Sequence, residues 1–155
     1  MATKGGKMKT VYFAHPLSHY DEDIEYKCME IIMTSFMNDE DEEQLYIFNP
    51  NDPVIDRLYK KRREDSHGPD PFSIFTELAR ACDYIVGACF TDGAIGYGVA
   101  TELQVQIDDG KQVYLIFFDD EFEGQKRFIM PVSSLSSFRV LNREETHQRN
   151  ADGFI

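Results

Sequence analysis

Short apolar segments alternate with helical patterns along this chain, and that order constrains the fold more than any other feature. Four segments rich in β-branched and aromatic residues are typical of strands, at 10–14, 45–48, 84–90 and 112–118. Segments with apolar residues about 3.6 positions apart follow them, at 21–37, 54–63, 72–82 and 99–109. Strands that alternate with helices favour a parallel sheet, and near-continuous apolar strands favour one that is covered on both faces.

The order predicts an α/β fold: a parallel sheet of four to five strands between two helical layers. A length of 155 residues fits one domain, so we expect residues 1–155 to form a single unit. The C-terminal part is less regular, with a short fifth strand expected at 138–141 and a partial helix at 143–148. Residues 1–9 and 150–155 are expected to be loose tails.

The composition excludes several classes of protein. With 16 basic and 28 acidic residues the net charge is −12, which repels a phosphate backbone, so we expect no nucleic-acid partner. The apolar segments are far shorter than the ~20 residues of a membrane span, and the basic N-terminus lacks the apolar stretch of a signal peptide. Three cysteines without CxxC spacing indicate a reducing cytoplasm and no structural zinc. We therefore expect a cytoplasmic protein with no membrane partner.

In an open α/β sheet, ligands bind beyond the carboxyl ends of the strands. The residues at these ends are the candidates for a site: Ala14, His15, Pro16, Leu17 and Ser18 after the first strand, Asn49 and Asp52 after the second, Thr91 and Asp92 after the third, and Asp119, Asp120 and Glu121 after the fourth.

The segment from Thr91 to Gly98 places Gly93, Gly96 and Gly98 just before a helix. Such glycines let the backbone approach a ligand, and a helix N-terminus favours anionic groups. The spacing is neither the GxGxxG fingerprint nor a P-loop, so a plain tight turn remains an equal alternative.

Glu102 lies in the first turn of the helix expected at 99–109. A carboxylate there usually stabilises the helix dipole. Here it also follows the glycine loop, with Asp92 close in sequence and Asp83 at the head of a neighbouring strand. Carboxylates around one pocket can divide into a nucleophile and a proton-handling acid, as the cleavage of a glycosidic bond requires.

Other polar residues give weaker signals. His15 and His19 are four apart, but Pro16 between them argues against a helix that presents both to a metal, and no HExxH motif or third ligand is nearby. We expect no metal and no cofactor, and His15 is the better candidate for a hydrogen bond to substrate. The basic cluster at 60–63 is either a solvated helix end or a contact for a substrate phosphate.

Several short motifs, in this order, resemble the nucleoside 2-deoxyribosyltransferase-like superfamily. They are Tyr12-Phe-Ala-His-Pro16, Asn49-Pro50, Cys82-Asp83-Tyr-Ile-Val86, Gly98-x-x-x-Glu102 and Gly110-Lys111-x-Val113. The resemblance covers residues 9–118, about 110 of the 155. It implies a flavodoxin-like, Rossmann-type sheet and an enzyme that acts on the N-glycosidic bond of a nucleoside or nucleotide, by transfer or by hydrolysis.

The resemblance also implies roles for individual residues. Glu102 is the nucleophile that forms a glycosyl-enzyme, and Tyr12 orients it. Asp83 helps to handle the base, and Asp92 is a second carboxylate. The implied substrate-binding residues are Ala14, His15, Pro16, Asn49, Asp52, Gly93, Gly96 and Gly98. A homo-oligomer, a dimer or larger, is implied as well, because neighbouring subunits often complete the site in this family.

The chain departs from the family pattern in several places. Gln104 stands where many members have glycine, the loop between Asp92 and Gly98 is longer than in the transferases, and Thr91-Asp-Gly93 replaces a serine-glycine step that binds phosphate. An aspartate there repels a 5′-phosphate, which favours nucleosides. Two other classes stay open: a non-catalytic protein that senses a nucleotide or nucleotide-sugar, and an acidic protein that contacts a basic partner through 39–43 and 119–123.

Overall fold

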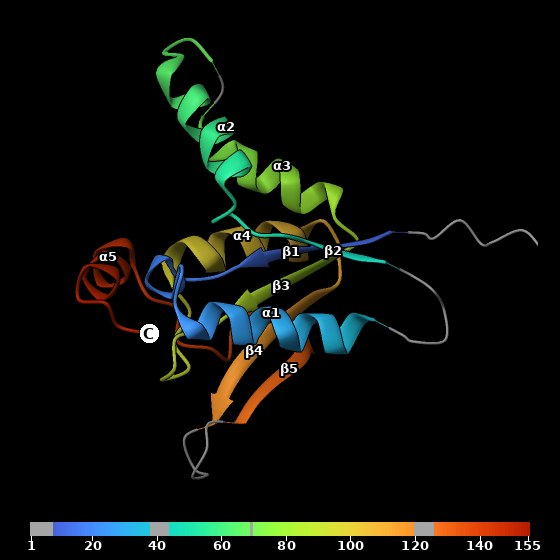
Figure 1. The fold of residues 1–155 in the computed structure, drawn as a ribbon. Helices are drawn as coiled ribbons and strands as arrows, with labels where there is room; N and C mark the ends of the chain where they lie inside the picture. The colour runs from blue at the N-terminus through green and yellow to red at the C-terminus, as the bar shows by residue number, and fades with distance from the viewer. Residues whose placement is uncertain (1–7, 38–43, 69, 120–125) are drawn as a thin grey trace, which may run out of the picture.

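The protein is described here by a computed structural model that covers residues 8–37, 44–68, 70–119 and 126–155. Its sheet has the order β2-β1-β3-β4-β5 (Figure 1). The strands are β1 (Lys9–Ala14), β2 (Leu45–Phe48), β3 (Tyr84–Ala88), β4 (Val113–Asp119) and β5 (Lys126–Val132). The first four are parallel and β5 is antiparallel to β4. The parallel part has the strand order of flavodoxin-like sheets, as predicted.

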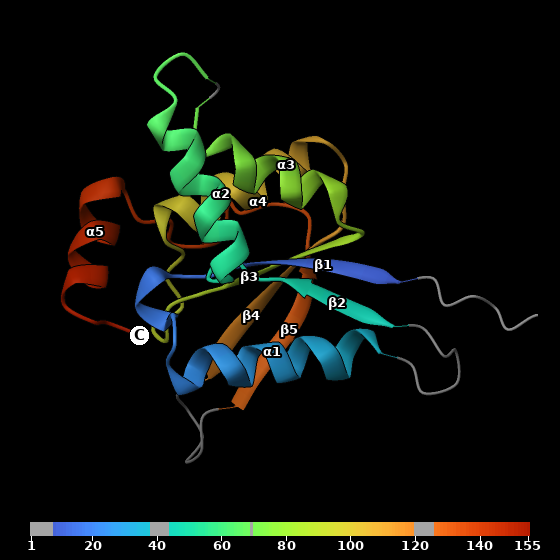
Figure 2. The same ribbon diagram turned by 45° about the horizontal axis from the view of Figure 1, so that its top comes forward.

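Helices cover both faces of this sheet, which confirms the predicted three-layer α/β architecture (Figure 2). They are the 3-10 turn η1 (Leu17–His19), α1 (Asp23–Phe36), α2 (Pro53–Glu64), α3 (Ser73–Ala81), α4 (Tyr97–Asp108) and α5 (Arg143–Ala151). Helix α1 packs on one face and α4 with α3 on the other, while α2 extends outward beyond α3. Among the described residues, no helix is both long and apolar enough to cross a membrane.

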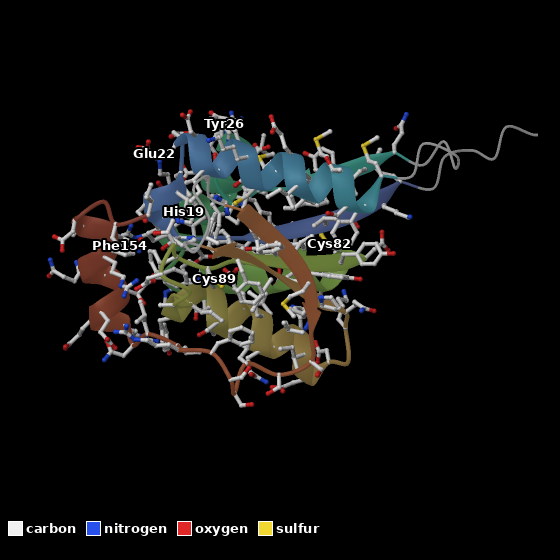
Figure 3. The ribbon with its side chains drawn as sticks, turned by 90° about the horizontal axis from the view of Figure 1, so that it is seen from below. His19, Glu22, Tyr26, Cys82, Cys89 and Phe154 are labelled. Atoms are coloured by element: carbon white, nitrogen blue, oxygen red, sulfur yellow. The ribbon has the colours of Figure 1, made fainter. Side chains whose placement is uncertain are left out.

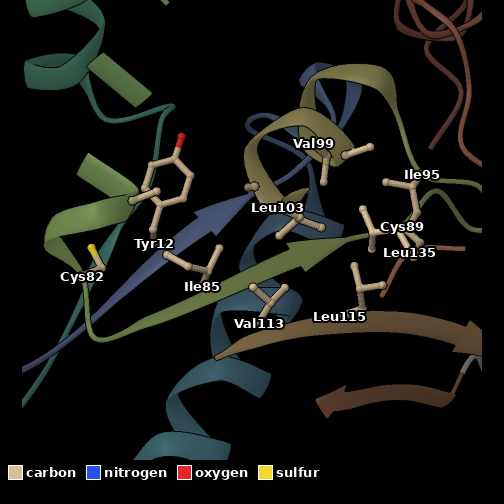
Figure 4. Packing of buried hydrophobic residues seen from close by; sticks show 13 residues of the cluster. Tyr12, Cys82, Ile85, Cys89, Ile95, Val99, Leu103, Val113, Leu115 and Leu135 are labelled. Atoms are coloured by element: carbon tan, nitrogen blue, oxygen red, sulfur yellow. The ribbon is translucent and has the colours of Figure 1, made fainter. Parts of the chain in front are cut away.

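The alternation of side chains along β1 divides the core into two parts. Val11 and Phe13 pack on the side of α1, and Tyr12 and Ala14 pack on the side of α4, with Leu103 from that helix (Figure 4). All four strand residues are almost fully buried. Successive residues of a strand face opposite sides, so a continuous apolar strand needs a helical layer on each side.

The predicted fifth strand at 138–141 is wrong. Within that segment, Val140 forms an isolated bridge with Ile95, while the strand that extends the sheet is β5. Pro131 in β5 argues against a strand when the sequence is read alone. A proline fits here because β5 is the edge of the sheet, where a missing N–H removes no hydrogen bond to a further strand.

The prediction of a loose C-terminal tail is also wrong. Helix α5 extends to Ala151, and its N-terminus has a capping box between Asn142 and Glu145. Beyond it, the Ile155 carbonyl oxygen accepts hydrogen bonds from His19 Nε2 and from the Thr91 backbone N–H. Figure 3 shows Phe154 on the same side of the molecule as His19.

Some sequence predictions fall outside the described residues. These are the N-terminal tail at 1–7, the acidic run at 39–43, and 120–123 of the second acidic run. Lys9, which was placed in the tail, is the first residue of β1.

Candidate active site

A cavity of about 400 Å³ opens at the carboxyl end of β1, between the sheet layer and the α2–α3 pair. This volume lies within the roughly 300–1,000 Å³ of small-molecule sites. Its lining residues come from the segment after β1, from α2 and α3, and from the first turns of α4: His15, Leu17, Tyr20, Pro50, Asp56, Tyr59, Phe72, Phe75, Gly98, Val99 and Glu102. A cavity of this size thus lies at the end of β1, where the sequence predicts a ligand site.

Glu102 forms part of this cavity from the second turn of α4. It was expected in the first turn, but α4 begins at Tyr97, two residues earlier than the apolar pattern indicated. Its side chain keeps partial access to solvent through the cavity, while protein atoms enclose it on the other sides. Burial raises the pKa of Glu102 to about 8, and the nearby Tyr12 hydroxyl lowers it only in part. The empty site therefore holds a protonated Glu102 at neutral pH.

Tyr12 projects from the middle of β1 towards the helices, with its hydroxyl at the far end (Figure 4). The residue is fully buried, and its hydroxyl has no hydrogen-bond partner of normal geometry among the described residues. Burial raises the pKa of Tyr12, and the Glu102 carboxylate raises it further. A buried hydroxyl without a partner is costly, so its place beside Glu102 requires a functional explanation.

Tyr20 brings a second hydroxyl to the cavity from the segment after η1. Burial raises its pKa, and the negative charges of Glu102, Glu25 and Asp56 raise it further. The phenol therefore stays protonated and can donate a hydrogen bond. Tyr12 and Tyr20 thus place two donors around one carboxyl group.

His15 lines the cavity, but its ring nitrogens are already engaged. Nε2 lies 2.6 Å from Glu25 Oε2, and Nδ1 lies 3.1 Å from the Phe13 carbonyl oxygen. The ring is stacked on Phe13, with centroids 4.1 Å apart. Burial acts to raise the pKa of Glu25, but hydrogen bonds from His15 and Asn51 outweigh it, and the net shift is downward. The predicted hydrogen bond from His15 to substrate is therefore not available, and His15 holds the wall of the cavity in place.

Four lining residues that sequence reasoning missed come from α2 and from the start of α3. Asp56 and Tyr59 are three apart, as are Phe72 and Phe75, so each pair shares one side of its helix. This spacing was visible in the sequence. What the sequence lacked was a sign that this side faces a cavity rather than the core.

The glycine loop contributes in three different ways. Gly98 lines the cavity, and a Cβ added there would meet no atom within 4 Å. Gly93 has a φ of 86°, which other residues rarely adopt, so it is needed for the turn. Gly96 precedes α4, and a Cβ there would lie 3.3 Å from Thr146 Cγ2. Only Gly98 of the three predicted glycines forms part of the described cavity wall.

Asp92 is not a free carboxylate at this site, which corrects its predicted role. Its two oxygens accept hydrogen bonds from Arg149 Nη1 and Nη2, each at 2.8 Å. This pair with Arg149 lowers the pKa of Asp92. The residue anchors α5 to the loop before α4.

Asp83 also lies away from the cavity. It precedes β3 at the amino end of the strand, where its Oδ2 accepts hydrogen bonds from the Thr10 backbone N–H and hydroxyl, at 2.9 and 3.2 Å. Figure 3 shows its neighbour Cys82 at the end of the sheet opposite His19. The role in base handling is therefore not supported by its position.

The remaining predicted residues support the site from outside. Asn49 and Asp52 lie on a shallow neighbouring hollow, where Asp52 caps α2 by accepting a hydrogen bond from the Val54 N–H at 2.8 Å. Ala14 is buried in the core at the end of β1, and Pro16 precedes η1.

The described residues include no group of side chains that is arranged for metal binding, and Cys82 and Cys89 are not activated thiols. Among the described residues, no three His, Cys, Asp or Glu side chains are grouped to hold a metal ion. Burial raises the pKa of Cys82 to about 11 and of Cys89 to about 12, so neither is a thiolate at neutral pH. The chemistry of the cavity therefore depends on Glu102 and its hydroxyl neighbours.

No protein-family model and no curated protein matches this chain. The resemblance to the nucleoside 2-deoxyribosyltransferase-like superfamily thus depends on the sequence motifs alone.

Proposed function

We propose that this protein cleaves or transfers the N-glycosidic bond of a nucleoside, with Glu102 as the nucleophile. One observation carries the proposal: the buried Tyr12 hydroxyl lies against the Glu102 carboxyl group, which lines a cavity of small-molecule size. Both residues occupy the positions that the motif resemblance assigns to the nucleophile and to the tyrosine that orients it.

The reaction would proceed in two displacements. Glu102 first loses its proton to solvent, and its carboxylate oxygen attacks the anomeric carbon as the bond to the base nitrogen breaks. The departing base takes the bonding electrons and a proton from water. Water or a second base then attacks the same carbon, loses a proton to solvent and releases the Glu102 carboxylate. Tyr12 and Tyr20 would donate hydrogen bonds to that carboxylate, which stabilises its ionised form. Positive charge that develops on the sugar would favour the same form.

The lining of the cavity favours nucleosides over their 5′-monophosphates. Neither lysine nor arginine occurs among its described lining residues, whereas Glu102 and Asp56 both do. A phosphate dianion would therefore meet the Asp56 carboxylate without a lysine or arginine among the described lining residues to bind it.

The test is base release, followed by liquid chromatography, from ribo- and deoxynucleosides and their 5′-monophosphates, with and without a second free base. We expect release from nucleosides by the wild type and a loss of at least 1,000-fold in Glu102→Gln and Glu102→Ala. The matched control is Glu144→Gln, because Glu144 is exposed on α5. A requirement for the second base would identify a transferase.

Full activity in the Glu102 variants would contradict the proposed mechanism. Nucleoside binding without turnover, on folded protein, would support the sensing alternative instead. Isothermal titration of the same panel separates these outcomes, since it detects binding in the absence of chemistry.

A further inference from the structure

Three aromatic rings form one wall of the cavity. The Tyr59 ring centroid lies 5.3 Å from that of Phe72 and 5.6 Å from that of Phe75, and the two phenylalanine centroids are 6.5 Å apart. Phe72 is 64% exposed, a high value for a side chain that already contacts two other rings. The wall therefore presents uncovered ring surface next to the reacting carboxyl group, and planar aromatic groups stack on such surfaces.

Asp56 stands beside this wall, one turn before Tyr59 on α2. Its carboxylate is paired with Lys60 at 2.8 Å, but both side chains are well exposed, at 48% and 66%. An exposed pair of this kind contributes little to stability, so a ligand can take the place of the lysine. An ionised carboxylate accepts hydrogen bonds and donates none.

The cavity thus has two chemically different ends. Glu102 and Tyr20 form a polar end that can hold hydroxyl groups, with Tyr12 buried behind Glu102, while Tyr59, Phe72 and Phe75 form an aromatic end with Asp56 next to it. The charge of Asp56 raises the pKa of Tyr20, as does that of Glu102, so both carboxylates lie close to the same phenol. A molecule that fills the cavity would extend from one carboxylate to the other.

We propose that the aromatic end selects a planar heterocycle that carries an amino group, which Asp56 recognises by accepting its N–H hydrogen bonds. Adenine and cytosine present such donors, whereas hypoxanthine and uracil present a carbonyl oxygen at the same position, which a carboxylate repels. This inference rests on the proposed function for the position of the sugar, but the selection of the heterocycle can be measured without any turnover.

The experiment measures equilibrium binding of free adenine, hypoxanthine, cytosine and uracil by isothermal titration. We expect the wild type to bind each amino-bearing base about tenfold more tightly than its carbonyl counterpart. Asp56→Asn adds an amide donor for the carbonyl oxygen, so this preference should fall to less than threefold. Phe72→Leu should weaken all four bases about tenfold and leave the preference unchanged.

Two controls match these changes. Glu64→Gln removes one negative charge from the end of the same helix, and Phe128→Leu removes an exposed ring on β5; both should bind as the wild type does. Circular dichroism and thermal unfolding establish that each variant is folded. The partial exposure of Asp56 and Phe72 makes folding of their variants the expected result.

The outcomes separate this inference from the proposed function. Absence of binding by all four bases, equal binding of amino and carbonyl bases, or Asp56→Asn with an unchanged preference would overturn the inference. The expected binding pattern without base release from any nucleoside would uphold it and contradict the proposed function. Base release that depends on Glu102, without a preference for amino-bearing bases, would support the proposed function and overturn the inference.

Discussion

At the scale of single residues, the cavity differs from its surroundings in how its polar groups are held. His15 is held by Glu25, and Asp92, outside the cavity, is held by Arg149. Glu102 lines the cavity, and the side chain beside it is the buried hydroxyl of Tyr12. The contrast indicates that Glu102 is the carboxyl group most available to a ligand.

The raised pKa of Glu102 predicts how stability depends on pH. An unfolded Glu102 loses its proton above its ordinary pKa of 4.5, whereas the folded protein keeps it up to about pH 8. Between these values a rise in pH therefore favours the unfolded state of the wild type. Glu102→Gln does not titrate, so it does not lose this stability. The difference in the free energy of unfolding, variant minus wild type, should therefore be roughly 2–4 kcal/mol larger at pH 8 than at pH 4.5.

Urea unfolding of both proteins across this pH range checks the prediction. Glu144→Gln serves as the control and should follow the wild type. Parallel curves for Glu102→Gln and the wild type would mean that Glu102 is ionised in the folded protein at neutral pH.

The position of Asp83 predicts a structural effect only. Asp83→Ala removes the acceptor for two Thr10 donors that join the amino ends of β1 and β3, and should lower the free energy of unfolding by about 1 kcal/mol. Base binding, and base release per folded molecule, should change less than twofold. A large loss of base binding or base release with unchanged stability would show that Asp83 takes part in the site.

At the scale of the elements, the sequence predicted the strands and helices well, but not all of their neighbours in space. The apolar runs of β1, β3 and β4 have a strong pattern, because each is buried on both faces. Strand β5 has no such pattern, since alternate residues such as Phe128 and Met130 are exposed at the sheet edge. The motif from Gly98 to Glu102 likewise predicted residues on one side of the cavity. The wall of three aromatic rings on the other side depends on how α2 and α3 pack, which no local motif indicates.

We expect the ion pair between Asp92 and Arg149 to be the main contact that holds α5 in place. Arg149 also lies over the Phe90 and Phe154 rings, with its guanidinium carbon 5.0 and 4.5 Å from their centroids. Because the pair is bidentate and Arg149 is only 17% exposed, a double-mutant cycle of Asp92→Ala and Arg149→Ala should give a coupling of about 1–2 kcal/mol.

Chemical denaturation at pH 7 measures this coupling. The pairing lowers the pKa of Asp92, so the contribution is present above the ordinary value of 3.8 and is lost as the pH falls below it. The coupling should therefore shrink towards zero near pH 2. A coupling of zero at pH 7 would show that α5 is anchored by its other contacts.

At the scale of the whole molecule, the C-terminal segment is held against the turn that follows β1, at the carboxyl edge of the sheet. Ser18 donates a hydrogen bond from its hydroxyl to the Phe154 carbonyl oxygen at 2.6 Å, and His19 Nε2 donates one to Ile155 at 2.9 Å. Burial lowers the pKa of His19 to about 4, so it is neutral at physiological pH. Loose tails are expected from short polar termini, and no local pattern in 150–155 indicated these long-range contacts.

Removal of residues 154–155 tests this connection. The shortened chain loses the acceptors for Ser18, His19 and the Thr91 N–H and leaves His19 buried, so its free energy of unfolding should fall by roughly 2–3 kcal/mol. Since η1 leads into Tyr20, base binding should weaken as well. A loss below 0.5 kcal/mol in urea unfolding would show that the tail adds little to stability.

The separation of the cavity into a sheet side and an α2–α3 side has an evolutionary consequence. Helix α2 contributes Asp56 and Tyr59 to the cavity, and Ile55 is its only buried residue. Drift in α2 therefore disturbs little of the core, whereas α3 belongs to it through Ala79, and Tyr12 and Glu102 stay fixed by the packing of β1 and α4. Descendants of such a chain can change the lining that α2 contributes and keep Tyr12 and Glu102 in place, which makes α2 the natural unit for laboratory recombination.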